Sequence, residues 1–155
     1  MSCLDKAEWQ YESTIEFLCE ETNCSENELK QQYKESIWEY ASNHITMFVV
    51  WLAMNDLLSE MHYEDESEVQ FINDLKCKNR SGFVFFEKYF DLTFSSEDIK
   101  SDVFSLLNNY YENDYLNDYC EIVDAFVTPF SWDGYDKVSA MISKVTGIPS
   151  ANSDK

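Results

Sequence analysis

The chain has 155 residues, 45% of them hydrophobic, and its 30 acidic and 11 basic residues give a formal net charge of −19. This charge excludes nucleic-acid binders, which need clustered Lys and Arg, and proteins that dock on anionic membrane surfaces. It would attract a basic protein and speed association with it. The alternative explanation of the charge is that it only keeps the protein soluble.

No repeat or Pro/Gly/Ser-rich linker divides the chain, so we expect one globular domain over residues 1–149 and a disordered tail over 150–155. Three Gly and two Pro are few for an all-β protein, which needs many tight turns. The expected fold is mainly α: a single compact domain of about six helices around a central apolar helix (45–58). A minor β element near 83–90 is left open.

Residues 1–24 show no sustained hydrophobic period and are expected to wrap around the domain, anchored by Trp9 and Tyr11. The motif SENE predicts a capping box, in which the side chains of Ser25 and Glu28 each accept a hydrogen bond from the other's backbone N–H. A helix to about Glu39 should follow.

The most apolar run, Ile45 to Met54, is apolar on every side, which predicts a helix buried at the centre of the fold. This run is too short for a membrane span, which needs about 20 residues. The N-terminus lacks the basic start and apolar run of a secretory signal, so a soluble, cytoplasmic protein is expected.

Helical spacing continues after this run. Val69, Ile72 and Leu75 predict a helix over ESEVQFINDL. The stretch SGFVFFEKYF is ambiguous between helix and strand, and helix is favoured. Ser95 or Ser96 should cap a helix whose apolar residues follow the 3.6 period as far as position 110.

Two more helices are expected in the C-terminal part. One covers about 114–125 and ends before Pro129, because proline disfavours helix in the residue before it. Ser131 should cap the last helix, and Gly147 and Pro149 should stop it. One face of that helix is apolar: Val138, Met141, Ile142 and Val145.

Few patterns in this chain point to catalysis or to a bound cofactor. Two histidines, no Gly-x-Ser-x-Gly elbow and no Gly-rich phosphate loop disfavour nucleophilic catalysis and nucleotide binding. The five cysteines include no C-x-x-C pair and the histidines offer no zinc spacing, so free thiols are expected. We therefore expect no enzyme activity, no cofactor and no metal ion.

The two histidines receive different predictions. His44 lies on the central apolar helix, where a hydrogen-bonded core histidine is expected. His62 lies in the acidic run from Glu60 to Glu66, which predicts a solvated loop residue with a raised pKa. A hard cation is the alternative for this run, but it lacks an Asp-x-Asp-x-Asp-Gly loop.

The stretch YYENDYLNDYCEIVD (110–124) is the strongest surface signal. On a helical wheel one side falls within about 80° and should face the domain: Tyr111, Tyr115, Tyr119, Ile122 and Phe126. The opposite side carries only acids: Asp114, Asp118, Glu121 and Asp124. Like charges at these spacings cost a helix about 0.2–0.5 kcal/mol per pair, and no Lys or Arg offsets them. This side therefore favours a partner surface, with a plain solvated face as the alternative.

A second acidic cluster, from Glu60 to Glu68, holds five acids and no base. We predict that both clusters bind the partner, through Asp114, Tyr115, Asp118, Tyr119, Glu121, Asp124, Glu64, Asp65, Glu66 and Glu68. The two tyrosines enter this set because tyrosine suits half-buried faces and interfaces.

Four segments stand out in this order: LDKAEWQYES, ASNHITMFVVWLAMNDLL, FSLLNNYYENDYLNDY and SWDGYDKV. Together they resemble a family of small, acidic bacterial proteins that carry D-x-A-E-W-H-Y, T-H-I-G-M-F-x-x-W, Y-Y-x-x-x-Y-x-x-D-Y and W-x-N-Y. The resemblance spans nearly the whole chain. Because aromatic and apolar residues dominate the motifs, it implies a shared fold more strongly than a shared chemistry.

This chain departs from the family pattern at three places. Gln10 stands where the family has His, Thr46 stands where it has Gly, and residues 16–40 resemble a longer, more helical insertion. If the family's His is catalytic, this chain lacks it, which further weakens an enzyme function.

Members of this family resemble immunity proteins, which are encoded beside secreted antibacterial toxins and protect the producing cell. The resemblance implies stoichiometric binding of one cognate toxin, and a basic toxin would gain association rate and specificity from an acidic partner. The alternative function is an acidic nucleic-acid mimic that inhibits a DNA-binding enzyme such as a restriction or CRISPR nuclease, with carboxylates in place of phosphates.

Overall fold

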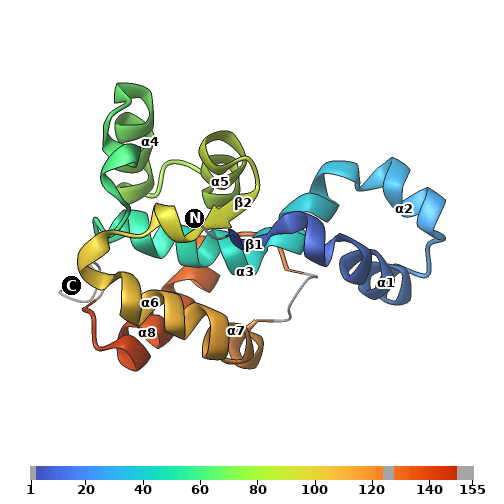
Figure 1. Ribbon diagram of the computed structural model, residues 1–155. Helices are drawn as coiled ribbons and strands as arrows, with labels where there is room; N and C mark the ends of the chain where they lie inside the picture. Colours follow the sequence, from blue (N-terminus) through green and yellow to red (C-terminus); the bar gives the residue numbers. More distant parts are fainter. Residues whose placement is uncertain (1–2, 124–127, 150–155) are drawn as a thin grey trace.

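The computed structural model describes residues 3–123 and 128–149, and most of them are helical (Figure 1). The α-helices are α1 (Tyr11–Thr22), α2 (Glu26–Gln32), α3 (Lys34–Met54), α4 (Glu66–Lys76), α5 (Gly82–Phe90), α6 (Phe104–Tyr110), α7 (Leu116–Ile122) and α8 (Trp132–Thr146). The strands are β1 (Cys3–Lys6) and β2 (Thr93–Ser95). The 3₁₀ turns are η1 (Ala7–Gln10), η2 (Glu60–Tyr63), η3 (Ser96–Asp98) and η4 (Ser101–Val103), and η5 (Tyr111–Tyr115) is a π-helix. The prediction of a mainly α fold is confirmed.

Helix α3 runs through the centre of the molecule (Figure 1). In that view α4 and α5 lie on one side of it, α6 and α8 lie on the other, and α1 and α2 extend beyond one end. Every residue from Ala41 to Met54 is buried, as the all-round apolar run predicted. The helix ends at Met54 rather than at residue 58.

Aromatic rings fill the core between α3, β2 and the π-helix. Phe48 of α3 packs edge-on against Tyr111 and Tyr115, with ring centroids 4.9 Å apart in each pair. Its ring also lies 5.8 Å from that of Phe94 on β2. Such offset and edge-to-face pairs are the favoured aromatic geometries, and Tyr111, Tyr115 and Tyr119 face the core as predicted. Ile122, predicted on the same side, is exposed, and Phe126 lies outside the described residues.

The two strands form a small antiparallel sheet, in which Lys6 lies opposite Thr93 and a bulge falls between Cys3 and Asp5. The segment near 83–90 is the helix α5, so the favoured prediction for it is confirmed and the alternative of a minor β element there is wrong. The sheet attaches β1 to the middle of the chain and places Asp5 beside His44, at the middle of α3.

Residues 11–22 form a regular helix, contrary to the prediction of an irregular wrap. A smaller second core lies where α1, α2 and the start of α3 meet: Ile15, Leu18, Leu29 and Ile37. Tyr11 packs on Trp38 with ring centroids 4.4 Å apart, so it anchors the segment as predicted. Trp9 is 53% exposed, so its predicted anchoring role is wrong.

Two predicted caps are present, but the structure after each differs from the prediction. Ser25 and Glu28 form the capping box, yet α2 ends at Gln32 and does not reach Glu39. Ser95 forms a capping box with Asp98, but only one 3₁₀ turn follows it, and the helix starts later with α6.

The C-terminal helices follow the predicted order. α6, the π-helix and α7 are continuous, so the predicted helix over 114–125 starts earlier than expected. It also ends earlier, at Ile122, because Val123 is already extended. The Ser131 side chain caps α8, and Gly147, with φ of 78°, ends it as predicted. Val145 is exposed and does not belong to the buried face of α8.

Gly82, the first residue of α5, lies where no side chain fits. A Cβ atom there would be 2.6 Å from Phe130 Cε2 and 2.7 Å from Val50 Cγ2. We expect Gly82→Ala to lower the free energy of unfolding by about 1–3 kcal/mol through overpacking, as measured by urea unfolding. Val84→Ala, at an exposed site of the same helix, should change it by less than about 0.5 kcal/mol. Equal effects of the two variants would contradict the steric explanation.

Candidate functional site

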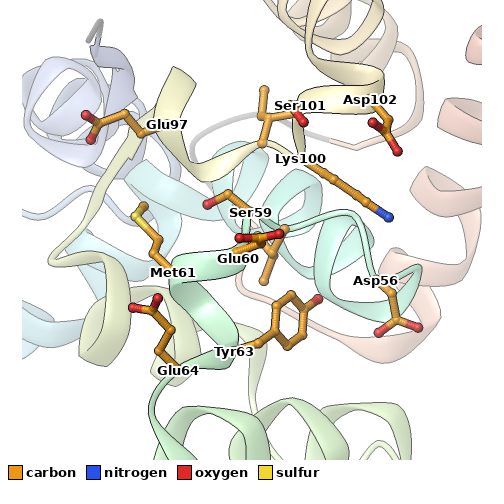
Figure 2. Close-up of a pocket in the computed structure, with 12 residues that line it drawn as sticks. Asp56, Ser59, Glu60, Met61, Tyr63, Glu64, Glu97, Lys100, Ser101 and Asp102 are labelled. Carbon is orange, nitrogen blue, oxygen red and sulfur yellow. The ribbon is translucent and has the colours of Figure 1, made fainter.

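An open cleft of about 1070 Å³ lies between η2 and the segment formed by η3 and η4 (Figure 2). The backbone N–H of Ser59 donates to the carbonyl of Asp98 at 2.9 Å, which joins the two walls. Leu58 and Ile99, both buried, pair as an antiparallel bridge at the same place. We call this the acidic cleft, and backbone hydrogen bonds rather than mobile side chains fix its floor.

Exposed acidic side chains surround this cleft in Figure 2: Asp56, Glu60, Glu64, Glu97 and Asp102. Lys100 is the one basic residue among the described residues that line it. Asp56 is ion-paired with Lys76, whose Nζ lies 2.7 Å from Oδ1. Met61 and Tyr63, both exposed, add the residue types that are enriched in protein interfaces. The cleft therefore suits cationic side chains together with some apolar contact.

His62 lies behind the cleft, between two buried carboxylates. Its Nδ1 is 2.6 Å from Glu68 Oε2, and its Nε2 is 2.8 Å from Asp98 Oδ1. Because ionised carboxylates only accept hydrogen bonds, both ring nitrogens carry protons and the imidazole is a cation. Phe90 stacks on the ring, with centroids 4.6 Å apart. This His62 group joins η2, α4 and η3, and thereby supports both walls of the cleft.

The prediction of a solvated His62 is wrong, since the residue is 4% exposed, but its predicted raised pKa is confirmed. Burial alone lowers the pKa of His62, whereas the hydrogen bonds to Asp98 and Glu68 and their charges outweigh it and raise the pKa to about 9. Glu68 is buried too, so it belongs to this group rather than to the contact surface predicted for it.

A second buried polar group, the Asp5 cluster, joins β1, α3 and the π-helix. Asp5 Oδ2 lies 3.0 Å from His44 Nε2 and accepts a hydrogen bond from the Tyr111 hydroxyl at 2.8 Å. Asp5 Oδ1 accepts from the Lys6 backbone N–H at 2.9 Å, and the Tyr115 hydroxyl donates to the His44 carbonyl. The predicted hydrogen-bonded core histidine is confirmed for His44. Residues of three sequence motifs thus meet in one cluster.

The π-helix brings the tyrosines of this cluster to the core, and such helices are rare and often found at functional sites. Burial raises the pKa of Tyr111 and of Tyr115 well above the usual value, so both hydroxyls remain protonated donors. Tyr119 is also buried, and its hydroxyl accepts from Asn43 Nδ2 at 2.9 Å. The predicted partner contacts of Tyr115 and Tyr119 are therefore wrong, because neither side chain reaches the surface.

The acids predicted on the opposite side of this helix are divided. Asp114 and Glu121 are exposed. Asp118 is half-buried and accepts a hydrogen bond from the Tyr110 hydroxyl at 2.9 Å. Asp124 lies outside the described residues. Two exposed acids of the predicted stripe thus stay available for a partner.

In the second predicted cluster, Glu64, Asp65 and Glu66 are exposed. Glu64 lines the acidic cleft, whereas Asp65 caps α4 by accepting from the Ser67 N–H at 3.1 Å. The prediction missed three acids of the cleft that come from other segments: Asp56, Glu97 and Asp102. The acidic run SSEDIKSD was the available signal for two of them, but no local pattern shows that it pairs with the end of α3.

Within residues 3–123 and 128–149, no three His, Cys, Asp or Glu side chains are grouped so that they could hold a metal ion. The same described part contains no helix with the length and apolarity that a membrane crossing requires. The five cysteines are free thiols.

A family model described as a domain of unknown function, DUF7832, matches residues 3–130. The match starts with β1 and includes the first three motifs, whereas SWDGYDKV and α8 lie beyond it. No curated protein and no solved structure matches the chain. Since the matched region covers well over half of the sequence, the chain belongs to the DUF7832 family.

Proposed function

We propose that this protein is an immunity protein, which binds one basic antibacterial toxin in the cytoplasm of the producing cell and blocks it stoichiometrically. The acidic cleft is the main docking surface. The observation that carries the proposal is the ring of five exposed acids around one open cleft, in a chain with a net charge of −19.

Electrostatics and shape both support a protein partner. A cleft lined by one sign of charge concentrates its field and raises the association rate of an oppositely charged protein. The exposed Met61 and Tyr63 give the partner apolar surface to bury, which charge alone does not provide. The bonded floor of the cleft keeps its shape before binding and so reduces the ordering cost of association.

The proposal that the basic partner is a toxin rests on the sequence resemblance to immunity proteins. Such a protein needs a stable scaffold, a complementary surface and no catalytic apparatus, which suits a chain whose two buried histidines are bonded to buried carboxylates. The exposed Asp114 and Glu121 belong to a second acidic surface that extends the contact to a large partner.

The test uses the protein encoded by the gene immediately upstream, since immunity genes commonly follow their toxin genes. Co-expression should rescue cells from that protein, and the two should form a stable complex. We expect the triple variant Glu60→Lys, Glu64→Lys, Glu97→Lys to associate about tenfold more slowly at low salt, measured by surface plasmon resonance. Raising the salt concentration should reduce the difference.

The matched control is Glu12→Lys, Glu16→Lys, Glu20→Lys, which gives the same net charge through three exposed acids of α1. It should slow association much less. Equal slowing by both triple variants would remove the cleft from the interface. If the wild-type protein instead displaces DNA from several unrelated binding proteins, the nucleic-acid mimic is the correct function.

A further inference from the structure

A second cavity, of about 300 Å³, opens where β1 and η1 meet α3 and the π-helix. The Asp5 cluster forms its buried wall, and Trp9, Glu112 and Leu116 form its exposed rim. It shares no lining residue with the acidic cleft, so it is a separate site.

Negative charge is held in fixed positions at this cavity. Three donors orient the Asp5 carboxylate: the His44 ring, the Tyr111 hydroxyl and the Lys6 backbone N–H. At the rim, Glu112 Oε1 accepts from Asn108 Nδ2 at 2.6 Å. The described residues that line the cavity include these two carboxylates and neither Lys nor Arg.

Trp9 supplies an aromatic surface at the same rim. It is half exposed, although burying so large a ring would stabilise the fold. The Lys6 Nζ lies 5.6 Å from the centroid of its ring, so this ring already attracts a cation within the chain. Tryptophan is also among the residues that contribute most to binding at protein interfaces.

We propose that this cavity binds the side chain of an arginine presented by a protein partner. The guanidinium stacks on Trp9 and pairs with Glu112 and with the Asp5 carboxylate, while Leu116 covers the methylene groups. Arginine fits better than lysine, because its planar group both stacks on an aromatic ring and donates to carboxylates in a fork. The proposal requires a basic partner but does not depend on the acidic cleft as the main docking surface.

The test titrates the whole protein with Nα-acetyl-arginine amide and follows the Trp9 indole N–H by NMR, with its resonance assigned from Trp9→Phe. We expect a saturable shift of this resonance and of the Glu112 amide. The lysine analogue should bind more weakly. The citrulline analogue, which has the shape of arginine but no charge, should not bind.

Two substitutions at the rim should weaken arginine binding, Trp9→Ala and Glu112→Gln, each by roughly fivefold. Lys6→Gln should strengthen it by removing a competing cation. The matched controls, Val145→Ala on α8 and Glu21→Gln in the last turn of α1, remove an exposed apolar group and an exposed charge elsewhere and should change nothing.

Three results would overturn the proposal: equal binding of citrulline, shifts spread over all acidic surfaces, or unchanged affinity in both rim variants. Because all three are independent of the charge-reversal experiment on the acidic cleft, a failure here leaves that experiment to decide the proposed function separately.

Discussion

Replacing His62 with alanine should lower the free energy of unfolding by about 3–5 kcal/mol, because it leaves Glu68 and Asp98 as buried carboxylates without their cation. Urea unfolding at pH 7 measures the effect. Met61→Ala, at the exposed neighbouring position, should stay within about 0.5 kcal/mol of the wild type. Neutralising both carboxylates by Glu68→Gln and Asp98→Asn in the His62→Ala background should recover part of the loss. A loss below about 1 kcal/mol for His62→Ala would contradict the buried ion group.

The same residue predicts how stability depends on pH. The pKa of His62 is about 9 in the folded protein and takes its ordinary value of 6.5 when the chain unfolds. The contribution of the cation is therefore fully present below pH 6.5 and is lost as the pH rises through 9. At 1.36 kcal/mol per pKa unit, it amounts to about 3 kcal/mol. The free energy of unfolding should be measured between pH 6 and 10 for the wild type and for His62→Gln. The difference between the two proteins should show this decline, because the titration of Tyr and Cys is common to both and cancels.

Replacing Asp5 with alanine should have the second large effect: it should lower the free energy of unfolding by about 2–4 kcal/mol. The change removes the shared acceptor of His44 and Tyr111, and each buried donor left without it costs about 1–3 kcal/mol. Asp5→Asn keeps one carbonyl acceptor and should lose less. Glu8→Ala, at an exposed residue of η1, is the control and should be nearly neutral.

A double-mutant cycle separates the hydrogen bond from other effects of the Asp5 change. Asp5→Ala and Tyr111→Phe should be non-additive by about 1 kcal/mol, because each single variant already breaks the same bond. Full additivity would mean that the 2.8 Å contact between the two residues contributes nothing to stability.

The sequence was sufficient where a feature depends on a local period. Spacings of three to four residues correctly predict the inward side of Tyr111, Tyr115 and Tyr119, the all-round burial of α3 and two helix caps, though not the exposed Ile122. The tyrosines illustrate the limit of such reasoning. The helical wheel correctly predicts that Tyr115 and Tyr119 point inward. It does not distinguish a half-buried ring from a fully buried one.

Features that depend on tertiary pairing were missed or misread. His62 is buried with Glu68 and with Asp98, which lies 36 residues later, and both carboxylates bond to its ring. The local sequence shows only that acids surround His62, which does not predict this pairing. The cleft exists because a bridge between Leu58 and Ile99 aligns two separate acidic segments. The π-helix has no sequence signature in the 3.6 period, so the convergence of Tyr111 on Asp5 was not predicted.

The contacts that β1 makes with distant parts of the chain also affect the order in which the fold forms. The bond from Tyr111 to Asp5 spans 106 residues, in a fold otherwise dominated by helices whose contacts are mostly local. Contacts of this separation form slowly, because a long loop must close before they can form. Asp5 can bond to His44, 39 residues away, before this loop closes, but its cluster is complete only when Tyr111 also reaches it. The bond between Tyr111 and Asp5 is therefore expected to be among the last hydrogen bonds of the fold to form.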